Sequence, residues 1–459
     1  MVFRTFVASQ CGARLDSDVL TGGGTDDTAA IQGILDMASD PETGVRLIMD
    51  GAALITGLSV YSNTIIECQN PACGFYLADH SDCSIVVNAH QTKTADAQSE
   101  PLHFGMIEDE NISLIGGTYN HNCQNQAHDK PRPNSEHVDF TVTFWFEGVR
   151  NLTLRDLTIR DQRTFAALIT NWENVNVENV RIDLPHKEHA ENQDGLHFFG
   201  PGRILNIRNL SGNAGDDFLA LAPDEADQCS SITDVNIDGV HLEDADQGIR
   251  MLVRNKGRLD RVNIKNVTGT YRSFGFFIQP FFDDGVDPDG GFGDIIIDTV
   301  NLHQNGVDYH YTTPFLFRLG GNFDHITLRN IYSIKPIDAR SLLDIGWQAG
   351  DDSHVTEETA TKIGTLLIDG LHVYQTEAAC GDMSFIKIKK SRINHFTIRN
   401  TEIVRQDSVP AKGQLIQLFD GVNIGTLYLN GVLVQRVAKL LAGDKESIDR
   451  RIEHNVEWL

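Results

Sequence analysis

A short pattern of alternating apolar residues recurs along the chain from about residue 110 to the end. Each copy has two alternating apolar positions, then a polar, Gly, Asn or Asp corner, and then another apolar residue. This order predicts a short strand, a turn and the beginning of the next strand. The copies are NISLIGGTY (111–119), NLTLRDLTI (151–159), NVNVENVRI (174–182), ILNIRNLSG (204–212), DVNIDGVHL (234–242), RVNIKNVTG (261–269), HITLRNIYS (325–333), TLLIDGLHV (365–373), HFTIRNTEI (395–403) and TLYLNGVLV (426–434).

The spacing of these copies predicts a solenoid. Where the copies are closest they repeat at roughly two dozen residues, which is the length of one coil of a β-solenoid. A coil cannot bury its own apolar side chains, so neighbouring coils must stack into a continuous core. Asn and Gly suit the corners because they tolerate left-handed backbone conformations. We therefore predict an all-β fold, a single-stranded right-handed parallel β-helix, in which residues 121–140, 281–292 and 348–361 form loops beside a cleft.

The N-terminal segment GTDDTAAIQGILDMASD (24–40) predicts a helix instead. Its apolar residues lie near helical spacing, and Asp and Thr at its start can cap a helix. These apolar residues are Ala29, Ile31, Ile34, Leu35 and Met37. We expect the helix and the strands after it to cover the open end of the solenoid and to prevent edge-to-edge aggregation.

The domain organisation follows from the same pattern. We predict one parallel β-helix domain over residues 1–459, with an N-terminal cap and first coils at about 1–90. Regular coils are expected at about 104–440, and a C-terminal cap at 441–459.

The net charge narrows the class of partner. The formal net charge is −26 at pH 7 and Lys/Arg clusters are missing, so we expect neither nucleic acid nor an anionic membrane surface as a partner. The start of the chain lacks the long apolar region of a signal peptide, and no run reaches the roughly 20 apolar residues of a membrane span. The expected location is extracellular or periplasmic if a leader was removed, and cytoplasmic otherwise.

Residue types that often bind metals have an ordinary explanation in this sequence. Seven cysteines without C-x-x-C pairs predict neither a zinc site nor a complete disulfide framework, and most are expected to be small buried hydrophobes. We interpret His186 and His189 as loop residues, and the acidic segment 281–291 as a loop at the cleft edge rather than a calcium site. No cofactor and no metal ion is expected.

Candidate chemistry lies in three segments on successive coils, AENQDGLHFFG (190–200), NAGDDFLALAP (213–223) and DADQGIRMLV (244–253). Asp194 and Asp217 are 23 positions apart and each precedes an alternating strand, so we expect them to stack on one ladder. Strand alternation directs Leu196, Leu219 and Ile249 into the coil, and His197, Ala220 and Arg250 out of it.

These outward groups predict a compact polar patch. Since neighbouring strands lie about 4.8 Å apart, Asp194, Asp216, Asp217, His197 and Arg250 would share a patch roughly 10 Å across. Closely spaced carboxylates raise one another's pKa, so one can stay protonated as an acid while its neighbours act as bases. Inverting glycoside hydrolysis needs this arrangement. The other Asp–Asp pairs are assigned to helix caps or solvated loops, namely Asp26–Asp27, Asp283–Asp284 and Asp351–Asp352.

The same segments resemble a known family. NQDG (192–195), GDDFLAL (215–221) and GIRM (248–251) are similar to the N-x-D, G-D-D and G-x-R-I-K signatures of the polygalacturonase family of glycoside hydrolases, family 28. The start, GTDDTAAIQ with RLIMDGAALITG (46–57), resembles the capping region of that family and of related pectin-active β-helices.

The resemblance implies a role for each matched residue. Asp216 would be the general acid, Asp194 and Asp217 would activate the hydrolytic water, Asn192 would support the site, and Arg250 would bind substrate. The chain lacks the G-H-G motif of the family and the Lys of R-I-K, since Met251 and Leu252 follow Arg250. His197 is therefore a candidate substrate-binding residue in place of the missing His.

Three functions remain open from the sequence. The leading one is a glycoside hydrolase that cleaves an acidic, pectic or rhamnose-containing polysaccharide or oligosaccharide by inversion. The alternatives are a polysaccharide lyase or epimerase on the same scaffold, and a non-catalytic carbohydrate-binding β-helix. Each candidate residue also has a purely structural interpretation, in which the acids bond turn amides, Arg250 forms an ion pair with one of them and His197 is a surface or partly packed residue. Most aromatic residues are expected in the core, with one or two facing outward as a sugar platform. They are Trp145, Phe165, Trp172, Phe198, Phe276, Phe277 and Phe281.

Overall fold

The computed structural model describes most of the chain in two compact units, Met1–Ala220 and Leu221–Leu459, and each unit is described by itself. The described residues are 1–91, 108–127, 141–187, 192–227, 229–280, 290–306, 314–334, 342–346, 360–375, 384–406 and 413–459. Within these ranges we find no helix with the length and apolar character needed to cross a membrane.

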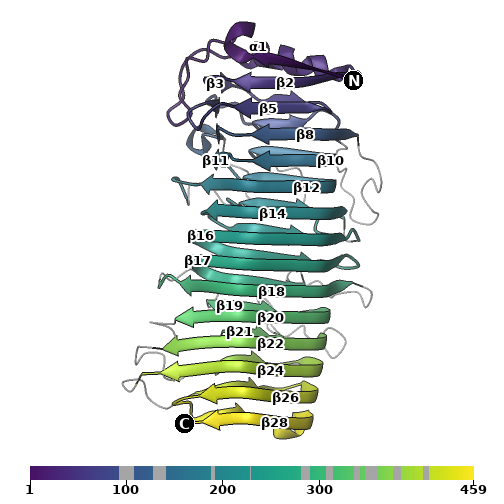
Figure 1. Cartoon of the computed structure of the whole chain (residues 1–459), viewed down its shortest axis with the longest axis vertical. Coiled ribbons are helices and arrows are strands. Elements are labelled where there is room, and N and C mark those ends of the chain that lie inside the picture. The colour runs from purple at the N-terminus through teal and green to yellow at the C-terminus, as the bar shows by residue number, and fades with distance from the viewer. Residues whose placement is uncertain are drawn as a thin grey trace. The chain divides into compact units, whose positions relative to one another are not determined.

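Both units are built almost entirely from β-strands (Figure 1). The first unit contains β1 (Val2–Val7), η1 (Ala8–Cys11), α1 (Thr28–Leu35), η2 (Asp36–Ser39), β2 (Thr43–Met49), β3 (Ala52–Ile55), β4 (Leu58–Val60), β5 (Thr64–Cys68), β6 (Gly74–Leu77), β7 (Val86–Asn88), β8 (Asp109–Ile115), β9 (Thr118–Asn120), η3 (Cys123–Asn125), β10 (Phe144–Arg155), β11 (Thr158–Arg160), β12 (Ala167–Asp183), β13 (Leu196–Phe199), β14 (Gly202–Gly212) and the start of β15 (Asp217–Ala222). The second unit contains β16 (Ile232–Val253), β17 (Arg258–Pro280), β18 (Gly291–Gln304), β19 (Phe315–Leu319), β20 (Asn322–Ile334), β21 (Leu343–Ile345), β22 (Thr361–Gln375), β23 (Ser384–Ile388), β24 (Ser391–Arg405), β25 (Gln414–Leu418), β26 (Val422–Val434), β27 (Lys439–Ala442), η6 (Lys445–Ser447) and β28 (Ile448–Trp458).

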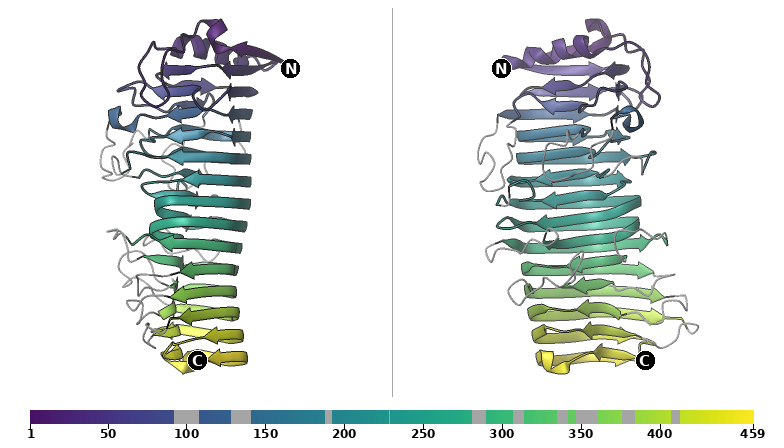
Figure 2. Two further views of the ribbon diagram at one scale, coloured as in Figure 1. Left: turned by 60° about the vertical axis from the view of Figure 1, so that its left-hand side comes forward. Right: turned by 180° about the vertical axis from the view of Figure 1, so that it is seen from behind.

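The strands form the predicted right-handed parallel β-helix. In the first unit Leu114 of β8, Leu154 of β10, Val177 of β12 and Ile207 of β14 lie opposite one another in parallel register, and all four are buried. Each coil thus covers the apolar side chains of the next, as the sequence pattern requires. Every one of the ten predicted copies lies in a strand region of the described structure. Figure 2 shows from two further sides that successive coils within each unit run parallel.

Asparagine side chains join the corners of neighbouring coils in the first unit. Asn63, Asn111, Asn151 and Asn174 all have a left-handed backbone, with φ between 56° and 61°. The side-chain amide of Asn111 donates to the Oδ1 of Asn63 at 2.9 Å, and Asn151 donates to Asn111 at 2.9 Å. Asn174 donates in turn to Asn151 at 2.8 Å. The predicted left-handed Asn corners are confirmed, and their side chains add a hydrogen-bonded ladder beside the backbone ladders.

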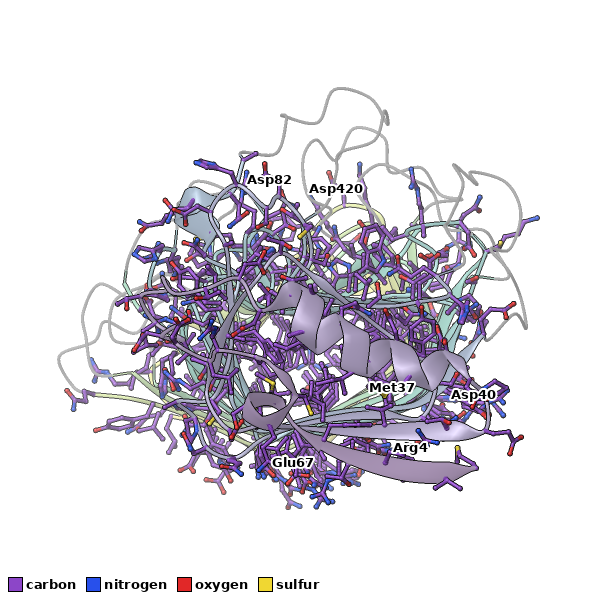
Figure 3. All side chains as sticks on the ribbon, turned by 90° about the horizontal axis from the view of Figure 1, so that it is seen from above. Arg4, Met37, Asp40, Glu67, Asp82 and Asp420 are labelled. Atoms are coloured by element: carbon purple, nitrogen blue, oxygen red, sulfur yellow. The ribbon has the colours of Figure 1, made fainter. Side chains whose placement is uncertain are left out.

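Helix α1 confirms the predicted N-terminal helix, and Figure 3 shows it lying across the end of the first unit. Its buried residues are Ile31, Ile34 and Leu35, whereas Met37 lies beyond the helix in η2 with 42% of its surface exposed. The prediction that Met37 belongs to the apolar helix face is therefore wrong. The helix ends before that residue, and the following 3-10 turn directs its side chain to the surface.

Of the two acids at the start of α1, one caps the helix and the other binds the preceding loop. The Oδ1 of Asp26 accepts a hydrogen bond from the backbone N–H of Thr28 at 2.9 Å. The carboxylate of Asp27 makes no cap bond and accepts instead from the backbone N–H groups of Arg14 and Leu15, at 2.6 and 2.8 Å. Asp27 therefore fastens the preceding loop onto the helix.

In the second unit the long strands form parallel ladders of their own, which include the last strand. Ile368 of β22, Ile398 of β24 and Leu429 of β26 lie opposite one another, and β28 pairs with β26 through Leu429 and Glu453. The segment predicted as a C-terminal cap thus contains a strand in parallel register, with mostly exposed side chains. That residues 1–459 form one domain stays a prediction.

Candidate active site

Two of the predicted site carboxylates lie on neighbouring coils of the first unit. The backbone N–H of Gly195 donates to the carbonyl of Asp217 at 2.9 Å, and that of Ala166 donates to the carbonyl of Asp194 at 3.0 Å. These bonds place Asp194 and Asp217 at equivalent positions of consecutive coils, each at the start of a strand. The structure therefore brings these two residues together in the order that their 23-residue spacing predicts.

The acids differ in their access to solvent. Asp194 and Asp217 are buried, with 2% and 6% of their surfaces exposed, whereas Asp216 is partly exposed. Asn192 is also partly exposed and takes a left-handed backbone with φ 54°, which turns the chain just before Asp194. An acid that must reach a substrate oxygen needs such access, while buried carboxylates are held in place by their surroundings.

His197 is fixed by three neighbours. Its Nδ1 atom lies 2.8 Å from the Oδ2 of Asp194. Its ring stacks on Phe165, with ring centroids 4.7 Å apart and 19° between the planes, and meets the edge of Phe199 at 4.8 Å. The ring is 4% exposed. His197 therefore has one orientation, set by a carboxylate and two aromatic rings.

Register explains how His197 is both outward-facing and buried. It lies opposite Leu168 of β12, which lies opposite Trp145 of β10, whereas Leu196 follows the alternate ladder through Ala167. His197 is thus on the face opposite to Leu196, as strand alternation predicts. Of the two structural interpretations of His197, a surface position is wrong and packing is correct, because apolar rings cover this face. Val142, Phe165 and Leu168 form a buried cluster there, with Trp145 and Phe199 packed against it.

Arg250, the predicted substrate-binding residue, lies in the second unit near the end of β16. It is 5% exposed, and its Nη1 donates to the Oε1 of Gln247 at 3.3 Å. Its guanidinium lies over the ring of Phe277, 4.9 Å from the centroid. The cation–π contact with Phe277 and the hydrogen bond to Gln247 together position this cation.

Arg318 and its neighbours extend the Arg250 surroundings, and sequence reasoning missed them. Phe277 lies opposite Arg318 of β19, which lies opposite Asp344 of β21. The guanidinium of Arg318 lies 3.9 Å from the ring centroid of Phe315, and its Nη2 lies 3.3 Å from the Oδ2 of Asp344. A cation between aromatic residues in FLFRL (315–319) was the available sequence signal.

The aromatic residues divide between the two faces of the coil. Trp172 meets Phe198 edge-on at 5.7 Å, and Phe276 stacks on Phe317 at 4.8 Å, in rows that also hold apolar core residues. Phe277 belongs to the alternate ladder with Arg250 and Arg318. Phe277, Trp145 and Phe165, which stacks on His197, are therefore on the outward side. Phe281 lies outside the described residues.

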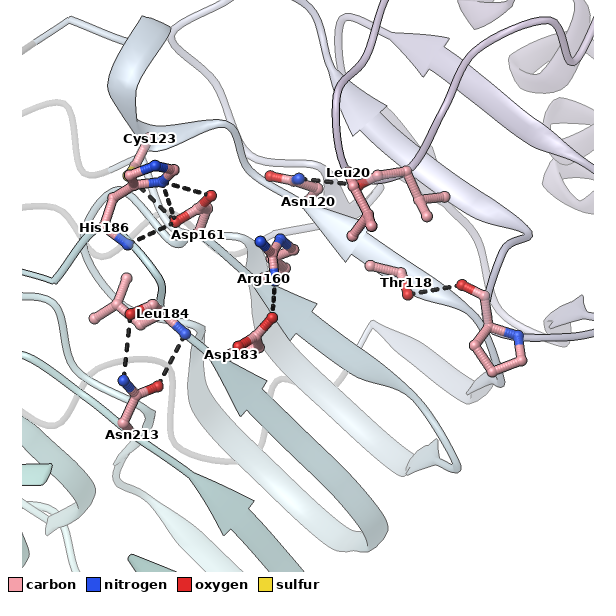
Figure 4. A network of polar contacts seen from close by, with 12 residues as sticks. Leu20, Thr118, Asn120, Cys123, Arg160, Asp161, Asp183, Leu184, His186 and Asn213 are labelled. Carbon is pink, nitrogen blue, oxygen red and sulfur yellow. Dashed lines mark hydrogen bonds and ion pairs between the residues drawn. The ribbon is translucent and has the colours of Figure 1, made fainter. Parts of the chain in front are cut away.

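A second polar cluster in the first unit was not predicted. Figure 4 shows Cys123, Asp161 and His186 together, and one possible ligand atom of each lies within 4.8 Å of the others. Burial, and then the neighbouring Asp161, raise the pKa of the Cys123 thiol to about 12. The thiol is therefore protonated at neutral pH and is no nucleophile. Its sequence signal was weak, because these residues are 38 and 25 positions apart.

Several other predictions fall on residues that the structure does not describe. They concern Asp283–Asp284, Asp351–Asp352, His189 and most of the 281–291 segment. Of the six described cysteines, Cys68, Cys73 and Cys123 are buried, Cys83 and Cys229 are partly exposed, and Cys11 is exposed. The expectation that most cysteines are buried thus holds for half of those described.

The comparison with family models falls on the segment that carries the three acids. Residues 72–241 match the model described as "Glycosyl hydrolases family 28". This part of the chain resembles that family. The match confirms the resemblance predicted from the motifs and includes Asp194, Asp216 and Asp217, whereas Arg250 lies beyond it. No curated protein matches the chain significantly.

Solved structures of two exopolygalacturonases and of an epimerase module are similar to the chain at low sequence identity. An exopolygalacturonase from Thermotoga maritima is 11% identical, with a TM-score of 0.46 over 98% of this chain and 92% of that one. A family 28 exopolygalacturonase from Yersinia enterocolitica is 13% identical, with a TM-score of 0.46 over 99% and 78%. The A-module of the Azotobacter vinelandii mannuronan C-5 epimerase AlgE6 is 11% identical, with a TM-score of 0.45 over 99% of both chains. Their printed activities differ, and nothing about the reaction of the present chain follows from them.

Proposed function

We propose that this protein is a glycoside hydrolase that cleaves an acidic or pectic polysaccharide or oligosaccharide with inversion. The observation that carries the proposal is the placement of Asp194 and Asp217 on consecutive coils, with the partly exposed Asp216 beside them. This placement lies within residues 72–241, the part that matches glycosyl hydrolases of family 28.

In the proposed mechanism the three acids have separate roles. Asp216 protonates the leaving glycosidic oxygen, which suits the acid with the greatest access to solvent. Asp194 and Asp217 activate the water that attacks the anomeric carbon from the opposite face of the sugar. The bond cleaved is the one between the anomeric carbon and the leaving oxygen, and the attacking water loses its proton to the carboxylates.

His197 and Asn192 support this arrangement in the proposal. The bond from His197 to Asp194 and the stack on Phe165 fix the direction of the Asp194 carboxylate. Asn192 turns the chain before Asp194, with its left-handed backbone. Groups held by several neighbours stay near the productive geometry without rearranging during the reaction.

The charge of Arg250 is the reason why we propose an acidic substrate. Its guanidinium is always charged, and a carboxylate can bond two of its N–H groups at once. Phe277 is fully buried, and its ring, 4.9 Å from the guanidinium, holds that group in place. The proposed substrate therefore carries uronate carboxylates, as pectic chains do.

The test is a screen of pectic and other acidic polysaccharides and oligosaccharides with the wild type, Asp216→Asn and Asp26→Asn. We expect the wild type to release reducing ends, and Asp216→Asn to lower kcat by about a thousandfold because the proton donor is lost. Asp26→Asn is the matched control. Asp26 also belongs to an Asp–Asp pair, Asp26–Asp27, but it is exposed and its carboxylate accepts from the Thr28 N–H at the start of α1.

Each other outcome points to a different function. Release of unsaturated, ultraviolet-absorbing products without new water-derived reducing ends would replace hydrolysis by a lyase reaction. Binding of an acidic polysaccharide without any turnover, unchanged in Asp216→Asn, would favour a non-catalytic carbohydrate-binding β-helix.

Where the wild type hydrolyses a substrate, nuclear magnetic resonance of the first product formed tests inversion directly, since the anomeric proton reports which anomer is released.

A further inference from the structure

The cluster of Cys123, Asp161 and His186 arises where three consecutive coils leave the sheet at one corner. Asn120 of β9 lies opposite Arg160 of β11, and Arg160 lies opposite Asp183 at the end of β12. The three cluster residues follow these strand ends by one to three positions. Backbone bonds continue the ladder beyond the strands, because Asp161 N–H donates to the Asp183 carbonyl at 3.0 Å and Cys123 N–H donates to the Asp161 carbonyl at 3.2 Å.

The side chains of the cluster converge on one carboxylate. The Nδ1 of His186 lies 2.9 Å from both oxygens of Asp161, and the Sγ of Cys123 lies 3.8 Å from its Oδ1. In a tetrahedral zinc site, bonds of the usual length place sulfur, nitrogen and oxygen ligands about 3.3–3.6 Å apart. The three ligand atoms here, all within 4.8 Å of one another, need only shifts of about an ångström to meet that geometry.

Burial and chemistry narrow the class of ligand. Cys123 is fully buried and the Asp161 side chain is 7% exposed, while the His186 side chain is 39% exposed and leaves one side of the cluster accessible. A thiolate, an imidazole and a carboxylate together favour zinc and similar divalent transition metals over calcium or magnesium, which prefer oxygen alone. The thiol faces the carboxylate and not the imidazole, so the cluster lacks the cysteine–histidine pairing of a nucleophile.

We propose that Cys123, Asp161 and His186 form a binding site for one zinc-class divalent metal ion. Binding replaces the hydrogen bonds of the cluster by three bonds to the metal and releases the thiol proton to solvent. The fourth position belongs to a ligand other than these three side chains. The site joins three consecutive coils at one corner, so the bound ion fastens the segments that follow β9, β11 and β12 to one another.

Neighbouring amides connect this site to the segment with the proposed catalytic acids. The side chain of Gln193 lies beside Cys123, where it lowers the pKa of the thiol, and it donates to the carbonyl of Gln162 at 3.0 Å. The side chain of Gln162 donates to the carbonyl of Asp194 at 3.1 Å. Such outer contacts usually orient metal ligands. Here they also lead directly to Asp194, so metal binding would stiffen the backbone at that residue.

The experiment measures the binding of Co²⁺, whose absorption spectrum depends on the ligands that hold it. The result therefore does not depend on the proposed hydrolase activity. Protein freed of metal by a chelator is titrated with cobalt chloride under reducing conditions. We expect one equivalent of Co²⁺ to give the thiolate-to-cobalt charge-transfer absorption together with the intense visible bands of four-coordinate cobalt. One equivalent of Zn²⁺ should abolish both, whereas Ca²⁺ and Mg²⁺ should leave them unchanged.

Matched variants assign the ligands. Cys123→Ser should lose the charge-transfer absorption, and His186→Gln should weaken Co²⁺ binding at least about tenfold. Cys229→Ser and His241→Gln are the controls, because these residues lie in the second unit, outside the cluster. Zn²⁺ should raise the thermal unfolding temperature of the wild type and both controls, but not that of Cys123→Ser.

Two results would overturn the proposal. One is a wild-type titration without charge-transfer absorption, and the other is an absorption that survives Cys123→Ser or disappears in Cys229→Ser. Circular dichroism of the metal-free variants shows whether each has folded. If Cys123→Ser does not fold, Cys123→Ala and His186→Gln provide the same comparison.

Discussion

Two histidine–aspartate pairs in the first unit have nearly equal bond lengths and very different surroundings. The Nδ1 of His197 lies 2.8 Å from Asp194, and the Nδ1 of His186 lies 2.9 Å from Asp161. The side chains of the first pair are 5% and 3% exposed, whereas those of the second are 39% and 7% exposed. The environment, and not the bond itself, distinguishes the two pairs.

The difference teaches what each pair is suited to do. Phe165 and Phe199 hold the His197 ring in one orientation, so this pair fixes a carboxylate direction in a place of low dielectric constant. His186 keeps one accessible side and has a thiol across the shared carboxylate, so its pair offers ligand atoms to an ion. The same bond therefore supports orientation in one place and metal binding in the other.

The largest expected effect separates the pairs by activity. Asp194→Asn should lower kcat by about a thousandfold, because it removes a water-activating carboxylate and the partner of His197. In metal-free protein, Asp161→Asn should leave kcat within about threefold, since that carboxylate takes no part in the proposed reaction. Steady-state kinetics on the best substrate of the screen measures both. Equal losses in two folded variants would contradict the distinction.

A large effect on stability should follow removal of the ring that stacks on His197. Phe165 is 3% exposed in a buried apolar cluster, so Phe165→Ala should lower the free energy of unfolding by about 3–5 kcal/mol. Phe3→Ala is a size-matched control, because Phe3 is 48% exposed and the expected loss is below about 1 kcal/mol. Urea unfolding measures both. A loss at Phe165 no larger than at Phe3 would mean that this face is not packed as described.

A third histidine, His121, sharpens the comparison because its contacts are a carbonyl and two donors instead of a carboxylate. Its Nε2 lies 3.0 Å from the Cys83 carbonyl, while Nδ1 accepts from the Arg163 N–H at 3.1 Å and lies 3.2 Å from the Thr143 hydroxyl. Burial lowers the pKa of His121 to about 4. Between that pH and about 6.5 the unfolded chain binds the proton and the folded chain does not.

The stability contributed by neutral His121 is therefore complete above about pH 6.5 and is lost as the pH falls toward 4, by about 3 kcal/mol in total. His121→Gln cannot take up this proton. Urea unfolding across the window should show the wild type losing its advantage over the variant as the pH falls. A difference between the two that is independent of pH would show that His121 is not held neutral.

The smallest effect on stability is expected at the partly exposed pair of His186 and Asp161. In metal-free protein, His186→Gln should change the free energy of unfolding by about 1 kcal/mol or less, because a partly exposed pair gains little from its charge. The same urea measurement, made with a chelator present, checks this value. A loss of several kcal/mol would identify the cluster as a stabilising hydrogen-bond network instead of a ligand site.

The coils could be predicted from the sequence because their determinants are local. Alternation of apolar residues sets the strands, and Asn residues such as Asn111 and Asn151 mark corners that few other residues adopt easily. The placement of Asp194 beside Asp217 follows equally from one coil length, since residues one coil apart must lie side by side. The family resemblance rests on these same local motifs.

Features that depend on contacts between coils could not be predicted. The burial of His197 requires Phe165, which belongs to the preceding coil and follows no fixed spacing from it. Alternation places the adjacent and equally buried Phe276 and Phe277 on opposite faces, but only the register with Phe317 and Arg318 shows which ring lies on which face. The Cys123 cluster combines three loops of unequal length, so no spacing rule identifies it.

The asparagine ladder makes the first unit modular. Each Asn side chain bonds its equivalents one coil away, in a conformation that is nearly the same at every step. Deletion of residues 151–173 would bring Asn174 against Asn111, and the amide would find the same acceptor in the same place. The corner thus has translational symmetry. Proteins with such corners can grow or shrink by whole coils without redesign of the remaining core, which gives evolution a way to change their length.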